Sequence, residues 1–337
     1  MKKTGSIFGI SLTLAACFLQ VVGVAAQGQG QGQGKGPGRG VGQDPGRGQD
    51  QRPGGRGMQY EGTVWIDPDK SEPAGTHYRL FSTPSRGPNT QASYLAYLPP
   101  DYETAPSRRY PVLYWLHGGG GNQRSGAPMA QRIDAKIRAG EIPPFIVILV
   151  QGLPSVRYIN TKDGTRPLED VIIKDLIPHV DATYRTIASR GSRGIEGFSM
   201  GGWGSLHLGF SHPELFGVVS GIAPSIDELS TEGDMVKENF GYDQAFYDSI
   251  APWSNVKDHA DAIRGGTVIR LLVGGQDKLL GPVTKYHELL TSLKIEHQFA
   301  VAPGAPHSDQ RVLDLLPFDG LAFWKTAFAA APSGRNR

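Results

Sequence analysis

Residues 197–201, which read Gly-Phe-Ser-Met-Gly, constrain the fold more than any other stretch of this chain. Residues 193–196 before them suit a strand, and residues 202–208 after them have helical character. A strand, a sharp turn and a helix are the context in which the pattern G-x-S-x-G exposes a serine. Glycine is required on both sides, because a Cβ there would collide with the neighbouring strand and helix. The pattern predicts that Ser199 is a candidate nucleophile at the start of a helix, whose free N–H groups favour negative charge.

A second glycine cluster follows an early apolar segment. Residues 110–116 predict a buried strand and run into His117, Gly118, Gly119 and two further glycines. A glycine run after a strand lets backbone N–H groups approach a ligand closely. The amides near Gly118 and Gly119, together with that of Met200, therefore form a candidate oxyanion hole. His117 is expected to shape this loop rather than to act as a base.

A serine hydroxyl attacks a carbonyl only when a base takes its proton and a carboxylate orients that base. Residues 268–273 predict a late strand, and Asp277 follows at its carboxyl end, the edge where α/β sites assemble. His307 lies in a loop just beyond the last predicted strand, residues 298–302. Asp309 is the alternative acid, but it lies only two residues from His307 and is expected to face away. The chain therefore offers a serine, an acid and a base in the order typical of such sites.

Predicted strands alternate with predicted helices through most of the chain. Two antiparallel edge strands are expected at residues 77–81 and 93–98. Buried strands are expected at residues 112–116, 145–150, 194–196, 217–222, 268–273 and 298–302. This alternation predicts an α/β fold, with a mostly parallel central sheet and helices on both faces. A helix over residues 170–183 is expected to pack beneath the sheet.

The segment 223–261 joins two predicted strands near the candidate site. It carries several aromatic side chains, namely Phe240, Tyr242, Phe246, Tyr247 and Trp253. Two interpretations stay open: the segment is a lid that lines an acyl pocket and grips an aromatic ring, or its aromatics merely pack it onto the domain. The candidate substrate contacts are His117, Trp203 and Trp253.

Composition excludes several classes of site. The chain has one cysteine, Cys17, in its leader, so the mature fold is expected to contain no disulfide and no cysteine nucleophile. The sequence has no Cys/His pair at metal-ligand spacing and no G-x-x-x-x-G-K phosphate loop. We therefore expect chemistry that needs no metal and no cofactor. Residues 58–332 are long enough to form one α/β domain with a sizeable core.

The N-terminus has the features of a secretory signal peptide. Lys2 and Lys3 precede an apolar run over residues 7–24, and cleavage is expected before Gln27, which makes residues 1–26 the signal peptide. In the alternative interpretation, Leu-Ala-Ala-Cys resembles a bacterial lipobox and leaves a lipid anchor at Cys17. Either way we expect a secreted or periplasmic protein without a membrane span, because the apolar run is short and interrupted by polar residues.

Residues 27–57 are of low complexity, with Gln-Gly repeats followed by Gly mixed with Arg, Pro and Asp. Such a segment has almost nothing to bury, so a disordered linker is expected, with contact to anionic glycans as the alternative. From Met58 onward the chain has 27 Lys and Arg against 30 Asp and Glu, a net charge of −3. This balance gives no indication of a nucleic-acid-binding domain.

The chain resembles the putative-esterase family of α/β-hydrolases, which includes feruloyl esterases, acetyl xylan esterases and the esterase D group. The stretches that carry the resemblance are residues 94–102, 111–122, 175–186, 197–202, 212–217 and 274–277. The resemblance covers residues 75–330 and implies an α/β-hydrolase fold. It also implies roles for the candidate residues: Ser199 as nucleophile, Asp277 as acid, His307 as base, and Gly118, Gly119 and Met200 as oxyanion hole.

Together with the predicted export, the resemblance implies a secreted carboxylic-ester hydrolase that works through an acyl-enzyme. Feruloyl or acetyl esters of plant or algal polysaccharides are the expected substrates. Two alternatives stay open. One is acyl transfer to a sugar hydroxyl, as in the related mycolyl transferases, and the other is a non-catalytic polysaccharide-binding surface module.

Overall fold

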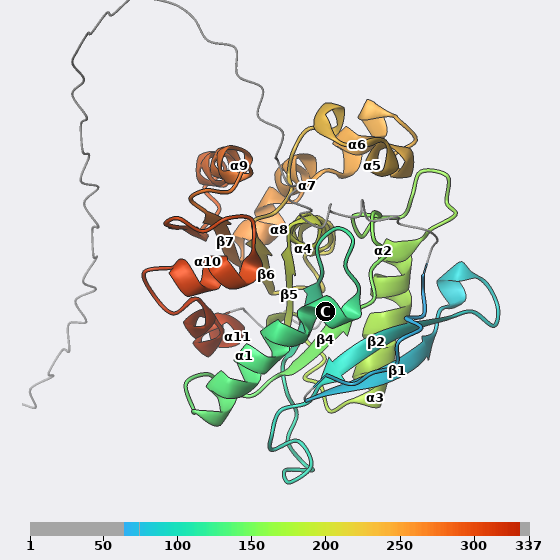
Figure 1. The fold of residues 1–337 in the computed structure, drawn as a ribbon, viewed down its shortest axis with the longest axis vertical. Helices are drawn as coiled ribbons and strands as arrows, with labels where there is room; N and C mark the ends of the chain where they lie inside the picture. The colour runs from blue at the N-terminus through green and yellow to red at the C-terminus, as the bar shows by residue number, and fades with distance from the viewer. Residues whose placement is uncertain (1–63, 74, 331–337) are drawn as a thin grey trace, which may run out of the picture. The chain divides into compact units, whose positions relative to one another are not determined.

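A computed structural model describes residues 64–73 and 75–330 of the chain. The predicted signal peptide (1–26), the alternative lipid-anchor site Cys17 and the predicted linker (27–57) lie outside the described residues. The described residues fold around one eight-stranded sheet, shown in Figure 1. None of the helices among these residues is long and apolar enough to cross a membrane.

The sheet has the strand order β1-β2-β4-β3-β5-β6-β7-β8. The pairs β1–β2 and β2–β4 are antiparallel, and all other neighbouring strands are parallel. The strands are β1 (Thr76–Ser82), β2 (Gln91–Tyr97), β3 (Val112–Leu116), β4 (Ile146–Val150), β5 (Arg193–Phe198), β6 (Val218–Ile222), β7 (Val268–Gly274) and β8 (Gln298–Ala302). Each predicted strand is therefore present, and the predicted, mostly parallel α/β sheet is confirmed.

The second predicted edge strand is not at an edge. Strand β2 pairs with β1 on one side and with β4 on the other, and every residue after Gln91 is buried. The prediction of an edge position was wrong because β4, which follows much later in the chain, pairs with the second side of β2, and the residues of β2 alone do not reveal that partner. Strand β1 forms one edge of the sheet and β8 forms the other.

The connections that follow β3 and β5 determine where the candidate site lies. The chain passes from β3 to β4 on one side and then returns to β5 on the other side of β3. The loops that follow β3 and β5 therefore leave the sheet in opposite directions and open a crevice at the carboxyl ends of the strands. The glycine loop after β3 and Ser199 after β5 meet at this crevice.

Helices cover both faces of the sheet (Figure 1). Successive side chains of a strand point to opposite faces, so Tyr114 and Trp115 of β3 lie in two different buried clusters. The helices that contribute to the Tyr114 cluster are α2 (Leu168–Asp170), the π-helix η3 (Val171–Leu176), α3 (Ile177–Thr183), α4 (Met200–Ser211), α6 (Gln244–Ile250), α7 (Pro252–Asp258), α8 (Ala260–Arg264) and α9 (Leu280–Ser292). Those that contribute to the Trp115 cluster are α1 (Ala127–Arg138), α10 (Asp309–Leu315), η6 (Gly320–Lys325) and α11 (Ala327–Ala330).

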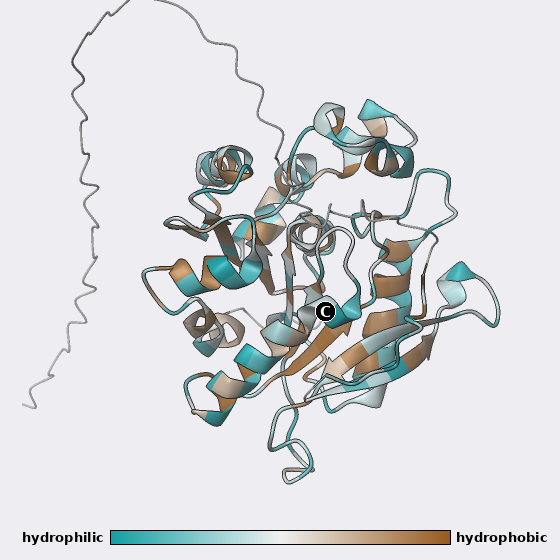
Figure 2. Cartoon of the chain, viewed as in Figure 1, coloured by the Kyte–Doolittle hydropathy of each residue, from teal (hydrophilic) through white to brown (hydrophobic). Residues whose placement is uncertain are grey.

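Short helices lie in the remaining connections. They are η1 (Pro84–Arg86), η2 (Gln123–Gly126), η4 (Arg190–Ser192), η5 (Leu229–Thr231) and α5 (Asp234–Asn239). In Figure 2 strand β4 is brown, whereas helix α1 carries teal as well as brown bands, as expected for a covered strand and a helix with one face exposed.

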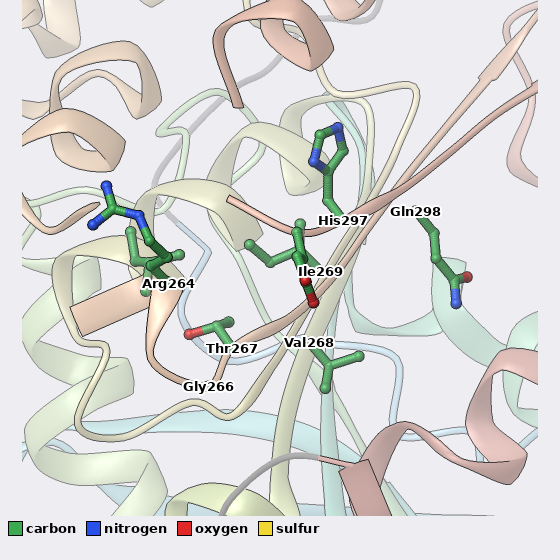
Figure 3. Close-up of a pocket in the computed structure, with 9 residues that line it drawn as sticks. Arg264, Gly266, Thr267, Val268, Ile269, His297 and Gln298 are labelled. Carbon is green, nitrogen blue, oxygen red and sulfur yellow. The ribbon is translucent and has the colours of Figure 1, made fainter. Parts of the chain in front are cut away.

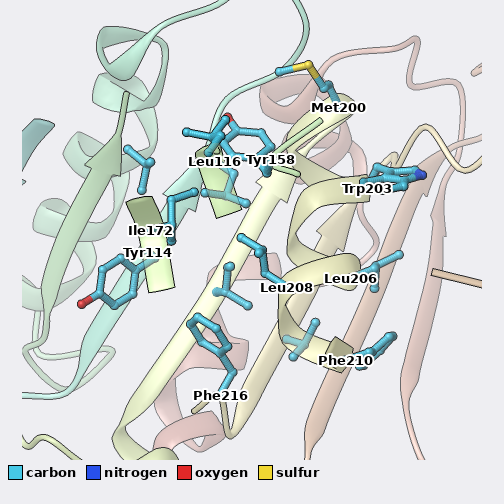
Figure 4. Packing of buried hydrophobic residues seen from close by; sticks show 14 of the residues in the cluster. Tyr114, Leu116, Tyr158, Ile172, Met200, Trp203, Leu206, Leu208, Phe210 and Phe216 are labelled. Carbon is cyan, nitrogen blue, oxygen red and sulfur yellow. The ribbon is translucent and has the colours of Figure 1, made fainter. Parts of the chain in front are cut away.

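Helix α4, which follows Ser199, is buried almost completely. Eleven of its twelve residues are buried, so this helix shows no polar face. Figure 4 shows Trp203, Leu206 and Phe210 of this helix, which belong to the same buried cluster as Tyr114. Burial of each such large apolar side chain contributes about 1.5–3 kcal/mol to stability. The helix therefore gives the turn at Ser199 a rigid support.

The predicted helix over residues 170–183 is interrupted in its hydrogen bonding. Helical structure runs from Leu168 to Thr183, but residues 171–176 form a π-helix between α2 and α3. Pro178 stands in the first turn of α3 and has no N–H to donate to the carbonyl of Lys174. A wider turn accommodates the missing α-helical bond.

A carboxylate links α2 to α4. Glu169 accepts hydrogen bonds from Nε2 of His207 at 3.0 Å and from Nε2 of His212 at 2.8 Å. Burial would raise the pKa of Glu169, but the two imidazoles outweigh burial and hold that pKa well below its usual range. Burial would lower the pKa of His212, but Glu169 outweighs burial and raises that pKa above its ordinary value of 6.5.

Replacing Glu169 with glutamine is expected to destabilise the protein most at mildly acidic pH. The lowered pKa of Glu169 stabilises the fold above its ordinary value of 4.5, and this contribution disappears as the pH falls through the folded pKa. The raised pKa of His212 stabilises the fold below 6.5, and this contribution disappears as the pH rises through the folded pKa. Between pH 4.5 and 6.5 both contributions are present.

We therefore expect the E169Q variant to lose about 1–3 kcal/mol at pH 5.5 and less at pH 9. Thermal unfolding of the variant and the wild type at both pH values measures this difference. Glu214→Gln is the matched control, because the Glu214 side chain is 65% exposed and lies 3.6 Å from the other nitrogen of His212. An equal loss at both pH values would show that charge does not account for the effect.

Candidate active site

Ser199 occupies a strained turn between β5 and α4. Its backbone has φ 55° and ψ −114°, a left-handed φ that is uncommon for a residue other than glycine. Three hydrogen bonds hold this backbone: Ser199 N donates to the carbonyl of Ile222 at 2.9 Å, and its own carbonyl accepts from the amides of Trp203 and Ser225 at 3.0 Å. The surrounding backbone thus maintains a conformation that lifts the hydroxyl out of the sheet.

The two glycines of the motif are required by close packing, as the sequence predicted. A Cβ on Gly197 would lie 2.1 Å from the carbonyl oxygen of Gly201. A Cβ on Gly201 would lie 2.1 Å from the carbonyl oxygen of Leu116 in β3. Both distances are far below van der Waals contact, and each clash is with backbone that cannot turn aside.

The structure brings the three predicted triad side chains into one hydrogen-bonded chain. His307 Nε2 lies 2.8 Å from Ser199 Oγ, and His307 Nδ1 lies 2.7 Å from Asp277 Oδ2. The carboxylate can only accept, so Nδ1–H donates to it and Nε2 of the neutral ring accepts from the serine hydroxyl. Asp277 has a fully buried side chain, and its Oδ1 accepts from the amide of Leu279 at 2.9 Å.

The strands place these residues at one edge of the sheet. Asp277 follows β7, His307 follows β8 and Ser199 follows β5, so all three stand beyond the carboxyl ends of parallel strands. The ring of Phe198 packs 4.8 Å from that of His307, measured between centroids. Asp309, the alternative acid, is the first residue of α10 and accepts from the amide of Gln310.

The glycine loop lies beside the serine. A Cβ on Gly118 would be 3.4 Å from Cβ of Ser199, and Gly119 and Met200 line the same cavity as Ser199. The amide of Gly120, a residue with φ 75°, donates to the carbonyl of Pro154 at 2.9 Å and fixes the turn. The predicted oxyanion-hole residues are thus adjacent to the hydroxyl.

His117 stabilises this loop through hydrogen bonds of both its ring nitrogens. Its Nδ1–H donates to the carbonyl of Gly118 at 2.8 Å, and its Nε2 accepts from the amide of Gly152 at 3.1 Å. Burial lowers the pKa of His117, which favours this neutral form. The hydroxyl of Tyr158 donates to the carbonyl of His117 at 2.9 Å. The ring is fully buried and does not line the cavity at Ser199, so His117 stabilises the loop and does not contact a ligand in that cavity.

The two tryptophans named as substrate contacts also lie away from that cavity. Trp203 is fully buried in α4 and stacks on His207, with ring centroids 5.1 Å apart. Trp253 in α7 donates from Nε1 to the carbonyl of Ile226 at 3.1 Å and lines a separate cavity. For Trp203 the sequence could not reveal this, because a helix that is apolar all round does not indicate which residue faces a ligand.

The cavity at Ser199 has a volume of about 400 Å³. Its walls include four of the predicted triad and oxyanion residues, namely Gly119, Ser199, Met200 and His307. The other lining residues were not named from the sequence; they are Pro154, Ser155, Arg157, Ser225, Asp227, Glu232, Met235, Val236, Lys278 and Leu279. The signals available were the interpretation of segment 223–261 as a pocket lining and, for the remaining residues, their place after strands that end at the active edge.

Arg157 forms one end of this cavity. It is 3% exposed, has φ 52°, and donates to the carbonyl and hydroxyl of Ser225 and to the carboxylate of Glu232. Since the amide of Ser225 donates to the carbonyl of Ser199, the guanidinium supports the backbone next to the serine. A buried, paired cation and carboxylate give this end of the cavity a polar character.

The segment 223–261 has features of both interpretations: some of its residues line the cavity, and its aromatic residues pack onto the domain. Five of its residues line the cavity at Ser199, and none of them is aromatic; they are Ser225, Asp227, Glu232, Met235 and Val236. Its aromatic residues Phe240, Phe246 and Tyr247 pack on one another and on Trp203. The segment therefore lines the pocket with α5 and packs onto the domain with its aromatics.

Another cavity, shown in Figure 3, lies at the amino ends of two strands of the sheet. Its volume is about 410 Å³, and Thr267, Val268 and Gln298 are among the residues that line it. These residues stand at the amino ends of β7 and β8, whereas the triad stands at the carboxyl ends. This cavity is thus separate from the candidate active site.

Comparison with known proteins identifies the family. A family model described as "Putative esterase" matches residues 85–328. The chain belongs to this esterase family. Its sheet and crossovers are those of the α/β-hydrolase fold, which the esterase family shares with its solved relatives.

Several relatives of the chain are named as esterases. The chain is 30% identical to an esterase of Mycobacterium tuberculosis over 208 residues, which is 60% of this chain and 40% of that protein. It is 36% identical over 114 residues to an endo-1,4-beta-xylanase/feruloyl esterase of Xylanibacter ruminicola, which is 32% of this chain and 16% of that protein. The chain thus spans less than half the length of these curated relatives. A solved ferulic acid esterase superimposes with a TM-score of 0.63 at 19% identity, over 75% of this chain and 98% of that one.

Proposed function

We propose that this member of the esterase family hydrolyses carboxylic esters through a covalent acyl-enzyme on Ser199. The observation that carries the proposal is the continuous hydrogen-bonded chain from Ser199 Oγ through His307 to the buried carboxylate of Asp277. This arrangement is the one by which proteins activate a serine hydroxyl. Membership of the esterase family supports the same reaction.

In the proposed acylation, His307 Nε2 takes the hydroxyl proton while Ser199 Oγ bonds to the ester carbonyl carbon. Negative charge then develops on the former carbonyl oxygen beside the amides of Gly119 and Met200, which donate hydrogen bonds to it. When the carbon–oxygen bond to the alcohol breaks, His307 gives its proton to the departing oxygen. Asp277 stabilises the imidazolium formed in between.

In the proposed deacylation, a water molecule replaces the alcohol. His307 takes a proton from this water as its oxygen bonds to the acyl carbon, and then returns the proton to Ser199 Oγ as the acyl–serine bond breaks. The products are a carboxylic acid and the free enzyme.

The proposed substrates are feruloyl or acetyl esters of plant or algal polysaccharides. Support comes from relatives named as feruloyl esterases, one of which is also a xylanase. Met235, Val236 and Leu279 give the cavity an apolar wall, and the pair of Arg157 and Glu232 gives it a polar end. A planar acyl group with polar substituents suits such a lining. Export, by signal cleavage before Gln27 or with a lipid anchor at Cys17, is part of this proposal.

An ester panel tests the proposal. Wild-type protein is expected to release acid from at least one of methyl ferulate, acetylated xylan and p-nitrophenyl acetate, and to be labelled by a fluorophosphonate at Ser199, as read by peptide mass spectrometry. Product analysis with an added sugar acceptor is expected to find free acid rather than a new sugar ester. A chain that neither turns over any of these esters nor reacts with the fluorophosphonate would overturn the proposal.

A further inference from the structure

A second and larger cavity adjoins the one at Ser199. Its volume is about 700 Å³, within the range of small-molecule sites, and Asp227 lines both cavities. The second cavity is lined by residues of η5, α6, α7 and α9, and Figure 1 shows α6, α7 and α9 in the upper part of the molecule. Its size and position make it a candidate for the part of the substrate that the first cavity does not hold.

The wall between the two cavities is short and well fixed. Ser225 and Asp227 line the first cavity, and Ile226, Asp227 and Glu228 line the second. The amide of Ser225 donates to the carbonyl of Ser199, so this wall begins at the nucleophile itself. The indole of Trp253 donates to the carbonyl of Ile226 at 3.1 Å, and the hydroxyl of Tyr247 donates to that of Asp227. The two cavities therefore lie on either side of one short, hydrogen-bonded segment that begins next to Ser199.

The lining of the second cavity mixes hydrogen-bond donors with acceptors. Lys257 and Lys285 are donors, Asp227 and Glu228 are acceptors, and Gln244 is both. The carboxylates would repel an anionic ligand, and the ammonium groups would repel a cationic one. An alkyl chain would desolvate all of these groups without replacing their hydrogen bonds. A neutral ligand with many hydroxyl groups matches both kinds of partner, because each hydroxyl donates and accepts.

The same cavity also offers an apolar surface. Trp253 lies partly exposed in it, with its ring held edge-on by Tyr286 at 5.0 Å between centroids and its N–H already bonded to backbone. Trp253 is thus fixed before any ligand arrives, which lowers the entropic cost of binding. The C–H face of a sugar ring is the ligand surface that suits an indole surrounded by polar groups.

We propose that the second cavity binds the saccharide that carries the ester, while the cavity at Ser199 holds the acyl group. This inference rests on the proposed esterase function and adds to it a site for the alcohol part of the substrate. Lys257 and Lys285 donate hydrogen bonds to sugar hydroxyls, and Trp253 contacts the ring face.

Kinetics with two esters of one acid test this inference. Wild-type protein and the K257A/K285A variant are compared on an acylated xylo-oligosaccharide and on the methyl ester of the same acid, which lacks the sugar. In the variant, kcat/KM for the oligosaccharide ester divided by kcat/KM for the methyl ester is expected to fall about tenfold, mainly through KM. The K70A/K325A variant, which removes the same charge from two exposed lysines, keeps the wild-type ratio.

An unchanged ratio in K257A/K285A, or a ratio that falls equally in the control variant, would overturn the inference. Failure of the proposed function is a different result, namely no turnover of either ester by the wild type. In that event, calorimetry of unmodified xylo-oligosaccharide with the Ser199→Ala variant decides the inference alone. Binding that weakens when Lys257 and Lys285 are also replaced supports a saccharide site, and absence of binding rejects it.

Discussion

Replacing Ser199 with alanine is expected to lower kcat for ester hydrolysis by roughly 10⁴–10⁶-fold, because no other group at the site can form the acyl-enzyme. His307 would keep its bond to Asp277, so the remaining site would still bind ester but would have no oxygen positioned 2.8 Å from the base. KM is therefore expected to change far less than kcat. Steady-state rates with p-nitrophenyl acetate measure the effect.

A matched serine variant separates this effect from general damage. Ser189 is partly exposed and makes no capping hydrogen bond with its side chain at the start of η4, so Ser189→Ala is expected to retain the wild-type rate. Both variants are expected to unfold at temperatures close to that of the wild type. If S199A kept more than about a tenth of the wild-type kcat, the acyl-enzyme route would be wrong, because residual catalysis without the nucleophile is far smaller.

Replacing Arg270 with methionine is expected to destabilise the protein by about 3–5 kcal/mol, which lowers the Tm by roughly 10 °C in a domain of this size. Glu196, Ser220 and Arg270 are direct neighbours across β5, β6 and β7, and all three are buried. The guanidinium donates to the carboxylate of Glu196, to the hydroxyl of Ser220 and to the carbonyl of Gly320. Without it, the ionised carboxylate would stay buried with no cation.

A double variant provides the control for this ion pair. Removing both charges in E196L/R270M is expected to recover most of the lost stability, because apolar groups of similar volume replace a buried ion pair at little cost. Arg264→Met, which removes an exposed arginine, is expected to leave Tm nearly unchanged. Differential scanning calorimetry of the three variants measures these effects. A double variant as unstable as R270M would show that packing or the bond to Gly320, rather than the unpaired carboxylate, accounts for the loss.

The sequence predicted the site as far as strand ends and chain order determine it. Parallel strands bring their carboxyl ends to one edge, so a serine, an aspartate and a histidine that follow β5, β7 and β8 are expected to meet. The glycines at positions 197 and 201 could be predicted because the motif itself implies a turn in which the backbone passes close to neighbouring backbone. The same reasoning identified the glycine loop after β3.

The parts that the sequence did not predict depend on contacts between distant loops. Arg157 and Glu232 form one end of the cavity, but neither stands in a periodic segment or a motif. Trp203 stands one helical turn after Ser199 and still faces the core, because α4 is enclosed on all sides. Strand β2 was predicted at an edge but pairs with both β1 and β4, because pairing with a strand far along the chain cannot be read from the residues of β2.

The candidate catalytic residues follow the strand ends, whereas part of the cavity wall comes from segment 223–261, and this separation bears on how substrate selectivity can change. The reacting groups stand on loops fixed by the sheet, whereas Met235 and Val236 of the cavity wall come from the short helix α5. Under the proposed function, exchanges within α5 would alter which acyl groups fit, while the geometry at Ser199 would be inherited unchanged. Such modularity lets one scaffold yield a series of enzymes with different selectivity through substitutions in a few surface turns.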